Sequence, residues 1–147
     1  MPPTLSADQS LALWYQVTVR MLQESGPDLS SRQIAVLLTV YMNDRPHTVR
    51  GLATDLRISK PAITRALDRL CDEGLLRRKT DDRDRRSVLI QKTVKGSTFL
   101  HDFGEAIRQV TEASMSVDPM PSHSRRISRL SWPILGLGTG SGKVELS

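Results

Sequence analysis

The sequence contains a single cysteine, Cys71, in 147 residues, which excludes an internal disulfide framework and fits a reducing compartment. No apolar run approaches the roughly 20 residues that a membrane-spanning helix needs, and the opening segment lacks the basic and apolar regions of a signal peptide. We therefore expect a cytoplasmic protein without a membrane partner. Histidines are scattered, and no metal-ligand spacing, nucleophile–base set or paired carboxylates occur. We expect neither an enzyme nor a metal or organic cofactor.

Positive charge gathers in the middle of the chain. The formal net charge is +5, but residues 45–95 carry fourteen basic side chains against seven acidic ones, whereas the rest of the chain carries seven against nine. The hydrophobic content of 38% is ordinary for one globular domain with a buried core. A basic segment inside a folded domain predicts a polyanionic partner, most often nucleic acid.

Two capping boxes predict the first two helices. Ser6 with Gln9 and Ser30 with Gln33 have the spacing at which a serine and a glutamine side chain each satisfy a free backbone amide. Apolar residues follow each box at helical spacing, and the Gly-Pro pair at residues 26–27 is expected to end the first helix.

A helix-turn-helix is predicted next. Thr48 is expected to cap a short helix that ends near residue 56, and residues 57–58 form a tight connection. Ser59 is expected to cap the following helix, which Gly74 ends. Two helices joined by so short a turn are typical of this motif.

The segment after Gly74 predicts a hairpin and then a long helix. Residues 75–79 and 87–91 have the pattern of two strands, and a helix follows from about residue 93 to residue 115. The order of elements predicts a mainly α fold, a winged helix-turn-helix with a small β-hairpin wing and long flanking helices.

The hairpin tip, KTDDRDRRSV at residues 79–88, alternates charges of both signs. If the preceding helix lies in a DNA major groove, the hairpin reaches the flanking minor groove, whose negative potential favours an inserted arginine. Arg86 is the first candidate for insertion. The tip also offers two arginines for phosphate contact and two aspartates that can hold a neighbouring guanidinium in one rotamer: Arg83, Arg85, Asp81 and Asp84. The alternative is a soluble, self-neutralising turn.

Residues 48–96, TVRGLATDLRISKPAITRALDRLCDEGLLRRKTDDRDRRSVLIQKTVKG, resemble the DNA-binding lobe of the MarR (multiple antibiotic resistance regulator) family. The wing DDRDRRSVLI, the helix start SKPAITRAL and the segment RLCDEGLLRR are all close to the family pattern. With weaker support, the resemblance covers about residues 6–117. It implies a bacterial transcription regulator, usually a homodimeric repressor that a small aromatic or anionic effector releases from DNA.

The resemblance also implies which residues meet DNA. Carried over by position, the residues facing the major groove are Ser59, Lys60, Pro61, Thr64 and Arg65. The wing contacts are Arg83, Arg85 and Arg86, with Asp84 orienting Arg86. Arg69 is a candidate for a phosphate contact or for a solvated side chain. Arg77, Arg78 and Lys79 are candidates for lining the DNA backbone, and strand alternation is expected to point one of them away.

Three further residues have two interpretations each. Trp14 and Tyr15 could form the floor of an effector pocket between the first helix and the DNA-binding lobe, or they could make core or dimer contacts. Cys71 could be a redox switch, as in some relatives, but its place at the end of the recognition helix favours a half-buried structural thiol.

The resemblance divides the chain into two parts. Residues 1–118 form a MarR-like domain, with a DNA-binding lobe at 45–95 and dimerisation helices at 6–25 and 93–117. Residues 119–147 depart from the family pattern, because their prolines and alternating glycines oppose a long amphipathic helix. This tail is expected to be flexible.

The sequence therefore predicts a regulator that binds double-stranded DNA. We expect a ligand-responsive repressor that recognises a pseudo-palindromic operator as a homodimer. The alternatives are a winged-helix protein-interaction module and a non-specific architectural DNA-binding protein.

Overall fold

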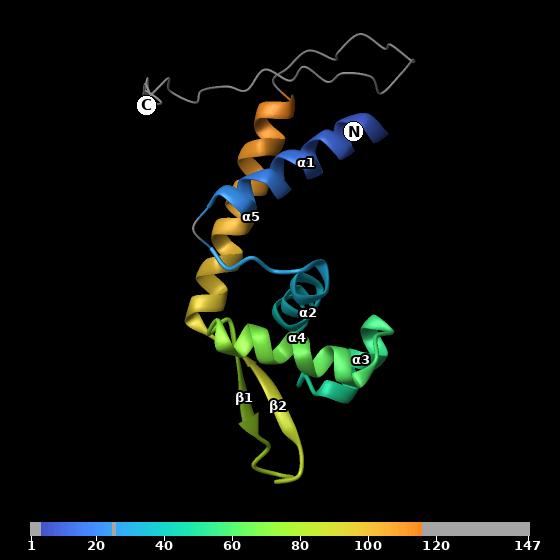
Figure 1. The fold of residues 1–147 in the computed structure, drawn as a ribbon, viewed down its shortest axis with the longest axis vertical. Coiled ribbons are helices and arrows are strands. Elements are labelled where there is room, and N and C mark those ends of the chain that lie inside the picture. The colour runs from blue at the N-terminus through green and yellow to red at the C-terminus, as the bar shows by residue number, and fades with distance from the viewer. Residues whose placement is uncertain (1–3, 25, 116–147) are drawn as a thin grey trace, which may run out of the picture.

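The protein is represented by a computed structural model that describes residues 4–24 and 26–115. The predicted tail at 119–147 lies outside the described residues, as do residues 116–117 of the predicted last helix. The described elements, shown in Figure 1, are α1 (Ala7–Gln23), α2 (Ser31–Met42), α3 (Val49–Leu56), α4 (Lys60–Asp72), β1 (Leu76–Thr80), β2 (Val88–Lys92) and α5 (Val94–Met115).

Both predicted capping boxes are present. The Ser6 hydroxyl accepts a hydrogen bond from the Gln9 amide (3.2 Å), and the Gln9 side chain accepts one from the Ser6 amide (2.8 Å). Ser30 and Gln33 repeat the arrangement at the start of α2, at 3.3 and 2.8 Å. These bonds satisfy amides that have no partner inside the helix, and they fix where each helix begins.

The helix-turn-helix is formed by α3 and α4. Thr48 caps α3 as predicted, because its hydroxyl accepts a bond from the Gly51 amide (3.0 Å). The turn passes through Arg57 in the left-handed region (φ 52°, ψ 43°), which reverses the chain direction within two residues. Ser59 occupies the N-cap position of α4 in an extended conformation, but its side chain makes no capping bond. The predicted N-cap residue is therefore confirmed, although its hydroxyl does not bond to the helix.

The hairpin pairs β1 with β2 in antiparallel register, with Leu76 opposite Lys92 and Arg78 opposite Ile90. Each strand lies one residue later than predicted. His47 adds an unpredicted bridge, because its carbonyl oxygen accepts a hydrogen bond from the Ile90 amide (2.8 Å). The loop between α2 and α3 therefore pairs with the free edge of β2 at the base of the wing.

The core lies between α2, α3, α4 and the base of the hairpin. Its fully buried side chains come from each of these elements: Val36, Leu37, Val40, Leu52, Ile63, Leu67, Leu70 and Leu76. Gly74 adopts a positive φ of 72° after α4, a conformation that a residue with a side chain rarely adopts. This glycine lets the chain turn directly from α4 into β1.

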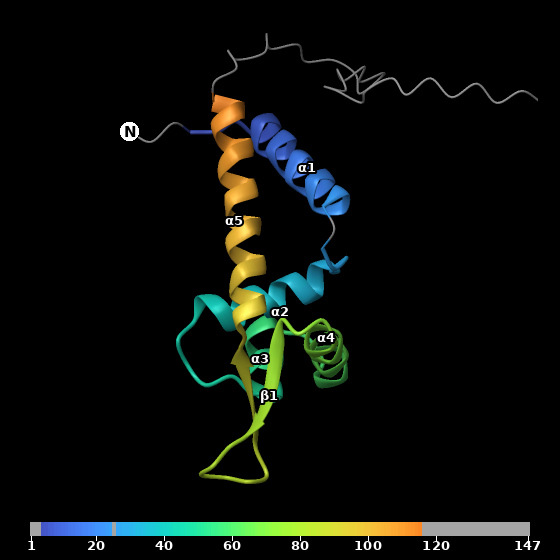
Figure 2. The same cartoon turned by 90° about the vertical axis from the view of Figure 1, so that its left-hand side faces the viewer.

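Helix α5 connects this lobe to α1. Figures 1 and 2 show α5 rising away from the hairpin, with α1 beside its C-terminal part and apart from α3 and α4. Val17 of α1 is buried, as are Ala106 and Val110 of α5, and the Arg20 guanidinium donates to the Gln109 side chain (2.8 Å). The predicted fold class, a mainly α winged helix-turn-helix with long flanking helices, is confirmed.

Candidate nucleic-acid interface

Helix α4 has one buried and one exposed side. The buried side carries Ala62, Ile63, Ala66, Leu67 and Leu70 at helical spacing. The opposite side exposes the residues predicted to meet DNA: Ser59 at the cap, then Lys60, Pro61, Thr64, Arg65 and Arg69. The predicted recognition residues therefore share one exposed helix side, as major-groove contact requires.

The hydroxyl of Thr64 is already engaged. It donates a hydrogen bond to the carbonyl oxygen of Lys60, one turn earlier, at 3.0 Å. The side chain therefore has its methyl group and oxygen lone pairs left for an outside partner. This arrangement suits an apolar contact with a thymine methyl group.

The two aspartates singled out in the wing loop hold its backbone. Asp81 accepts a hydrogen bond from the Arg83 amide (2.9 Å), and Asp84 accepts one from the Arg86 amide (3.1 Å). The Ser87 hydroxyl also donates to Asp84 (2.8 Å), and this bond, together with the Arg86 amide, lowers the pKa of the Asp84 carboxyl. The partners seen are two backbone amides and the Ser87 hydroxyl, whereas the sequence predicted bonds to guanidinium groups.

The basic side chains of α4 and the hairpin fall into two groups. In the first, an acidic neighbour forms an ion pair: Arg69 with Glu73 (2.8 Å), Arg78 with Asp68 (2.6 Å), Lys79 with Asp82 (3.5 Å) and Lys92 with Asp44 (2.8 Å). In the second, no ion pair is seen within residues 4–24 and 26–115, although each side chain is exposed: Lys60, Arg65, Arg77, Arg83, Arg85 and Arg86. Cations without an acidic partner have the most to gain from a phosphate or a base edge.

Arg78 joins the hairpin to α4. Its guanidinium lies 2.6 Å from the Asp68 carboxylate and 3.5 Å from the Thr64 carbonyl oxygen. Asp68 and Thr64 are one turn apart on the exposed side of α4. The strand of the wing and the exposed side of the recognition helix are therefore direct neighbours. Sequence patterns gave no sign of this pair, because its members belong to different elements.

Arg77 points elsewhere. It neighbours Arg78 on β1, and its side chain donates to the Gln91 side chain of β2 at 2.9 Å. Successive residues of a strand face opposite sides of the sheet, so Arg77 and Arg78 cannot both face α4.

Cys71 is half-buried at the end of α4. Burial raises the pKa of its thiol, and the nearby Arg78 guanidinium opposes this shift. A thiol with a raised pKa is mostly protonated at neutral pH and is a poor nucleophile. The position supports a structural role.

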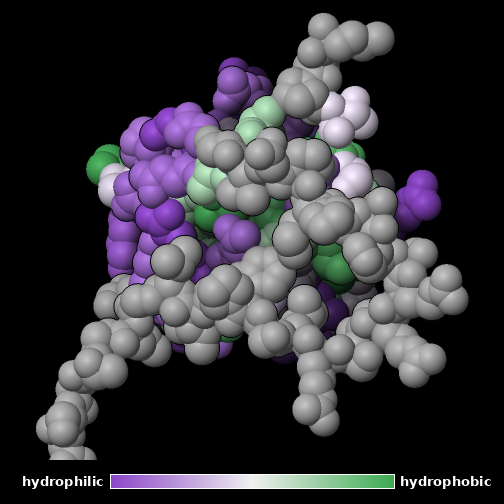
Figure 3. All heavy atoms as spheres, turned by 90° about the horizontal axis from the view of Figure 1, so that it is seen from above, coloured by the Kyte–Doolittle hydropathy of each residue, from purple (hydrophilic) through white to green (hydrophobic). Residues whose placement is uncertain are grey.

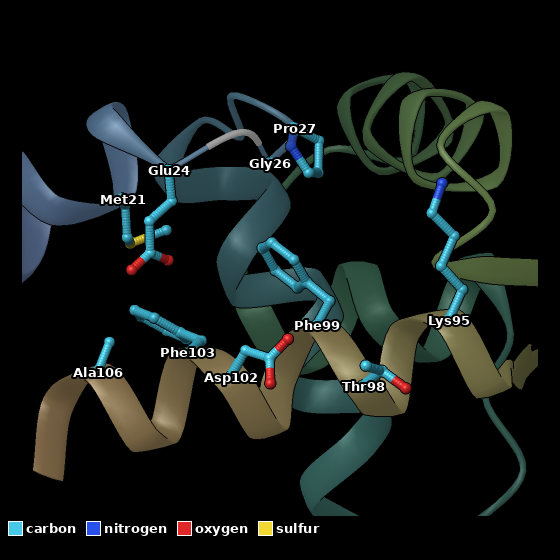
Figure 4. A pocket seen from close by; sticks show the side chains of 10 residues that line it. All are labelled: Met21, Glu24, Gly26, Pro27, Lys95, Thr98, Phe99, Asp102, Phe103 and Ala106. Atoms are coloured by element: carbon cyan, nitrogen blue, oxygen red, sulfur yellow. The ribbon is translucent and has the colours of Figure 1, made fainter.

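A cavity of about 530 Å³ lies between the end of α1 and α5. Figure 4 shows Met21 and Glu24 on one side and the rings of Phe99 and Phe103 on the other. Trp14 and Tyr15 do not line this cavity; they lie on α1 with more than half of their surface exposed. The sequence gave no means of locating this cavity, because its lining residues come from two segments far apart in the chain.

Two absences hold for the described part of the chain. It contains no group of three histidine, cysteine or acidic side chains placed to bind a metal ion. None of its helices is both long and apolar enough to cross a membrane.

Comparison with known proteins gives a family match. The MarR family model matches residues 29–88, from the end of the α1–α2 connection to the start of β2. The matched residues form the winged-helix part of the chain, which is therefore similar to the MarR family. No curated protein sequence matches the chain.

Solved structures of MarR-type regulators share the fold. A Staphylococcus aureus MepR variant bound to an oligodeoxyribonucleotide superposes with a TM-score of 0.65 at 20% identity, covering 73% of this chain and 76% of its own. Bacillus subtilis YusO gives 0.61 at 18% identity, covering 76% and 85%. The transcriptional regulator Tm0710 of Thermotoga maritima gives 0.61 at 22% identity, covering 74% of each chain. These similarities extend beyond residues 29–88 to most of the MarR fold.

Proposed function

We propose that this protein is a MarR-type transcription regulator that binds double-stranded DNA of a particular sequence. The observation that carries the proposal is the contact of Arg78 with Asp68, because it makes the wing and the exposed side of α4 neighbours. Cations without an acidic partner occur on both elements. A duplex offers a major groove wide enough for one helix, with phosphates and a minor groove beside it. The two elements therefore suit one continuous stretch of duplex.

Each cation has a proposed partner. Arg65 forms a bidentate contact with guanine, while Thr64 offers its methyl group to thymine. Arg86 enters the minor groove, and Arg83 and Arg85 bind phosphates. The remaining α4 contacts are Ser59, Lys60 and Pro61, with Arg69 and Arg77 near the DNA backbone.

The regulator acts as a homodimeric repressor in our proposal. Leu11, Tyr15 and Leu22 follow one another at about one and two helical turns along one side of α1, and each is more than half exposed. Figure 3, which views the molecule from the α1–α5 end, shows small hydrophobic areas among mainly hydrophilic residues. A second copy would cover the three α1 side chains and would place a second recognition helix about 34 Å away, which suits a pseudo-palindromic operator. The similar MepR variant bound to an oligodeoxyribonucleotide supports the DNA contact.

An effector site is proposed in the cavity between α1 and α5. Its volume of about 530 Å³ suits a small ligand, and the rings of Phe99 and Phe103 suit an aromatic one. Glu24 and Asp102 line it together with the single cation Lys95, so a neutral or cationic aromatic fits its charge better than an anion does. A bacterial, cytoplasmic setting accompanies this proposal, with residues 1–118 as the regulator domain.

The test is selection of duplexes from a random library with the full chain. We expect one near-palindromic sequence to be enriched and its affinity to fall steeply with salt. Arg86→Ala should weaken binding to that duplex by about ten-fold without loss of folding, and Arg65→Ala should relax base preference at one position. Sequence-independent binding would indicate an architectural protein, and no binding would indicate a protein-interaction module.

A further inference from the structure

We propose that Arg78 is a positioning residue that ties the wing to the recognition helix α4 and does not itself bind phosphate. This inference rests on the proposed function, because it concerns how the two DNA-contacting elements are held together. Arg78 belongs to a strand rich in basic residues, where a phosphate ligand is the obvious expectation. Its surroundings indicate a different role.

The direction of the side chain is set by the strand. Leu76 and Arg78 are two residues apart on β1, so both leave the strand on the same face. Leu76 is buried in the core. The Arg78 side chain therefore starts toward the core side of the hairpin, and its end passes over the adjoining surface of α4. Arg77 and Lys79 leave on the other face.

The guanidinium is held at two points of α4. It lies 2.6 Å from the Asp68 carboxylate, a short charge-assisted bond, and 3.5 Å from the carbonyl oxygen of Thr64. Thr64 precedes Arg65, the proposed base contact. The Arg78 guanidinium thus contacts the turn of α4 that carries Thr64 and Arg65, the two residues proposed to contact bases.

The pair also removes an unfavourable charge. Asp68 lies on the exposed side of α4, between the turns that carry Arg65 and Arg69. A carboxylate there would repel the DNA phosphates. With Arg78 beside it, this charge is neutralised, and the wing and α4 are held in one arrangement before DNA is met. Holding two contact elements together lowers the ordering cost of binding.

A double-mutant cycle on the full chain tests the proposal. Arg78→Met, Asp68→Asn and the combined variant are titrated with the duplex that the wild-type chain enriches from the random library. In the wild-type background Arg78→Met should weaken binding by about five-fold, and in the Asp68→Asn background by less than about two-fold. The dependence of log affinity on log salt should keep the wild-type slope.

A phosphate ligand would behave differently. Equal losses from Arg78→Met in both backgrounds, with a salt slope shallower by about 0.9, would overturn the proposal. Arg77→Met is the matched control, because Arg77 is the neighbouring cation on the other face and bonds to Gln91. Arg77→Met should change the affinity for the duplex by the same factor in the wild-type background and in the Asp68→Asn background.

Amide hydrogen exchange of the free protein separates this proposal from the proposed function. Arg78→Met and Asp68→Asn should each speed exchange in residues 76–92 by about five-fold, and the combined variant should add little. Arg77→Met should leave α4 exchange unchanged. If exchange in Arg78→Met proceeds at the wild-type rate, Arg78 does not hold the wing on α4, and this holds even if the protein binds DNA. If no duplex is enriched, the proposed function fails, and the exchange result still decides whether Arg78 holds the wing.

Discussion

At the scale of single residues, Gly96 determines how closely α5 approaches the winged-helix lobe. The Tyr41 hydroxyl lies 2.9 Å from the Leu75 carbonyl oxygen and accepts a hydrogen bond from the Thr93 amide (2.9 Å). Gly96 is buried beside this group. A Cβ atom at position 96 would clash with the Tyr41 hydroxyl and the Leu75 carbonyl oxygen, and would lie 2.8 Å from the Tyr41 ring carbon Cζ. The bonds that join α2, β1 and α5 therefore require a glycine.

Gly96→Ala should lower the free energy of unfolding by about 1–3 kcal/mol, because the added methyl group forces the backbone of Leu75 or the Tyr41 side chain to move. Gly104→Ala is the control in the same helix. A Cβ atom there would meet nothing within 4 Å, so alanine should stabilise α5 by about 0.5–1 kcal/mol. Urea titration followed by circular dichroism, at one protein concentration, measures both. Equal effects of the two substitutions would contradict the close-approach argument.

At the scale of elements, the helices begin in different ways. The first two have complete capping boxes, and α3 has one hydroxyl bond from Thr48. Ser59 leaves the first amides of α4 without a side-chain bond. Helix α4 thus presents the Ser59 hydroxyl and the amides of Lys60 and Ala62 at its start, and these groups suit an anionic partner.

Ser30→Ala and Ser59→Ala should therefore differ. Ser30→Ala removes the hydroxyl that accepts from the Gln33 amide, at a cost of about 1 kcal/mol in the free energy of unfolding. Ser59→Ala removes no capping bond and should change stability by less than about 0.5 kcal/mol. Thermal and urea unfolding of the two variants check this. A loss on Ser59→Ala as large as that on Ser30→Ala would show that the hydroxyl caps α4 in solution.

At the scale of the whole molecule, α1 has one covered side and one exposed side. Its buried Val17 packs toward α5, whereas Leu11 and Leu22 are each 68% exposed. Large exposed apolar side chains in a row along a helix are typical of an interaction surface. The proposed homodimer gives that surface a partner.

Light scattering tests the dimer. The full chain should have the mass of two copies, and a version that ends at Asp118 should keep it, because the exposed row lies on α1. Leu11→Glu combined with Leu22→Glu should give single chains, since the charges oppose burial of that side. A truncated chain that scatters as a monomer would instead assign the dimer contact to residues beyond 118.

Much of the fold followed from local patterns. The capping boxes at Ser6 and Ser30, the glycine at 74 and the apolar periods predicted five helices and a hairpin in the correct order. Strand ends were one residue early, because the residues at the ends of a strand carry little pattern of their own. Ser59 was correctly predicted as the N-cap residue of α4, but its missing side-chain bond was not predictable, because sequence spacing cannot show where a hydroxyl points.

The sequence by itself thus determined the helices and strands, the basic middle segment and the resemblance to the MarR family. Each of these depends on residues near one another in sequence. Tertiary structure decided which cations are free and which are paired, brought Arg78 to Asp68, and placed Met21 and Phe99 around one cavity. Such contacts depend on how helices and strands pack, and packing distance is not encoded in any short stretch of residues. The exposed side of α4 was predictable, but its connection to the wing was not.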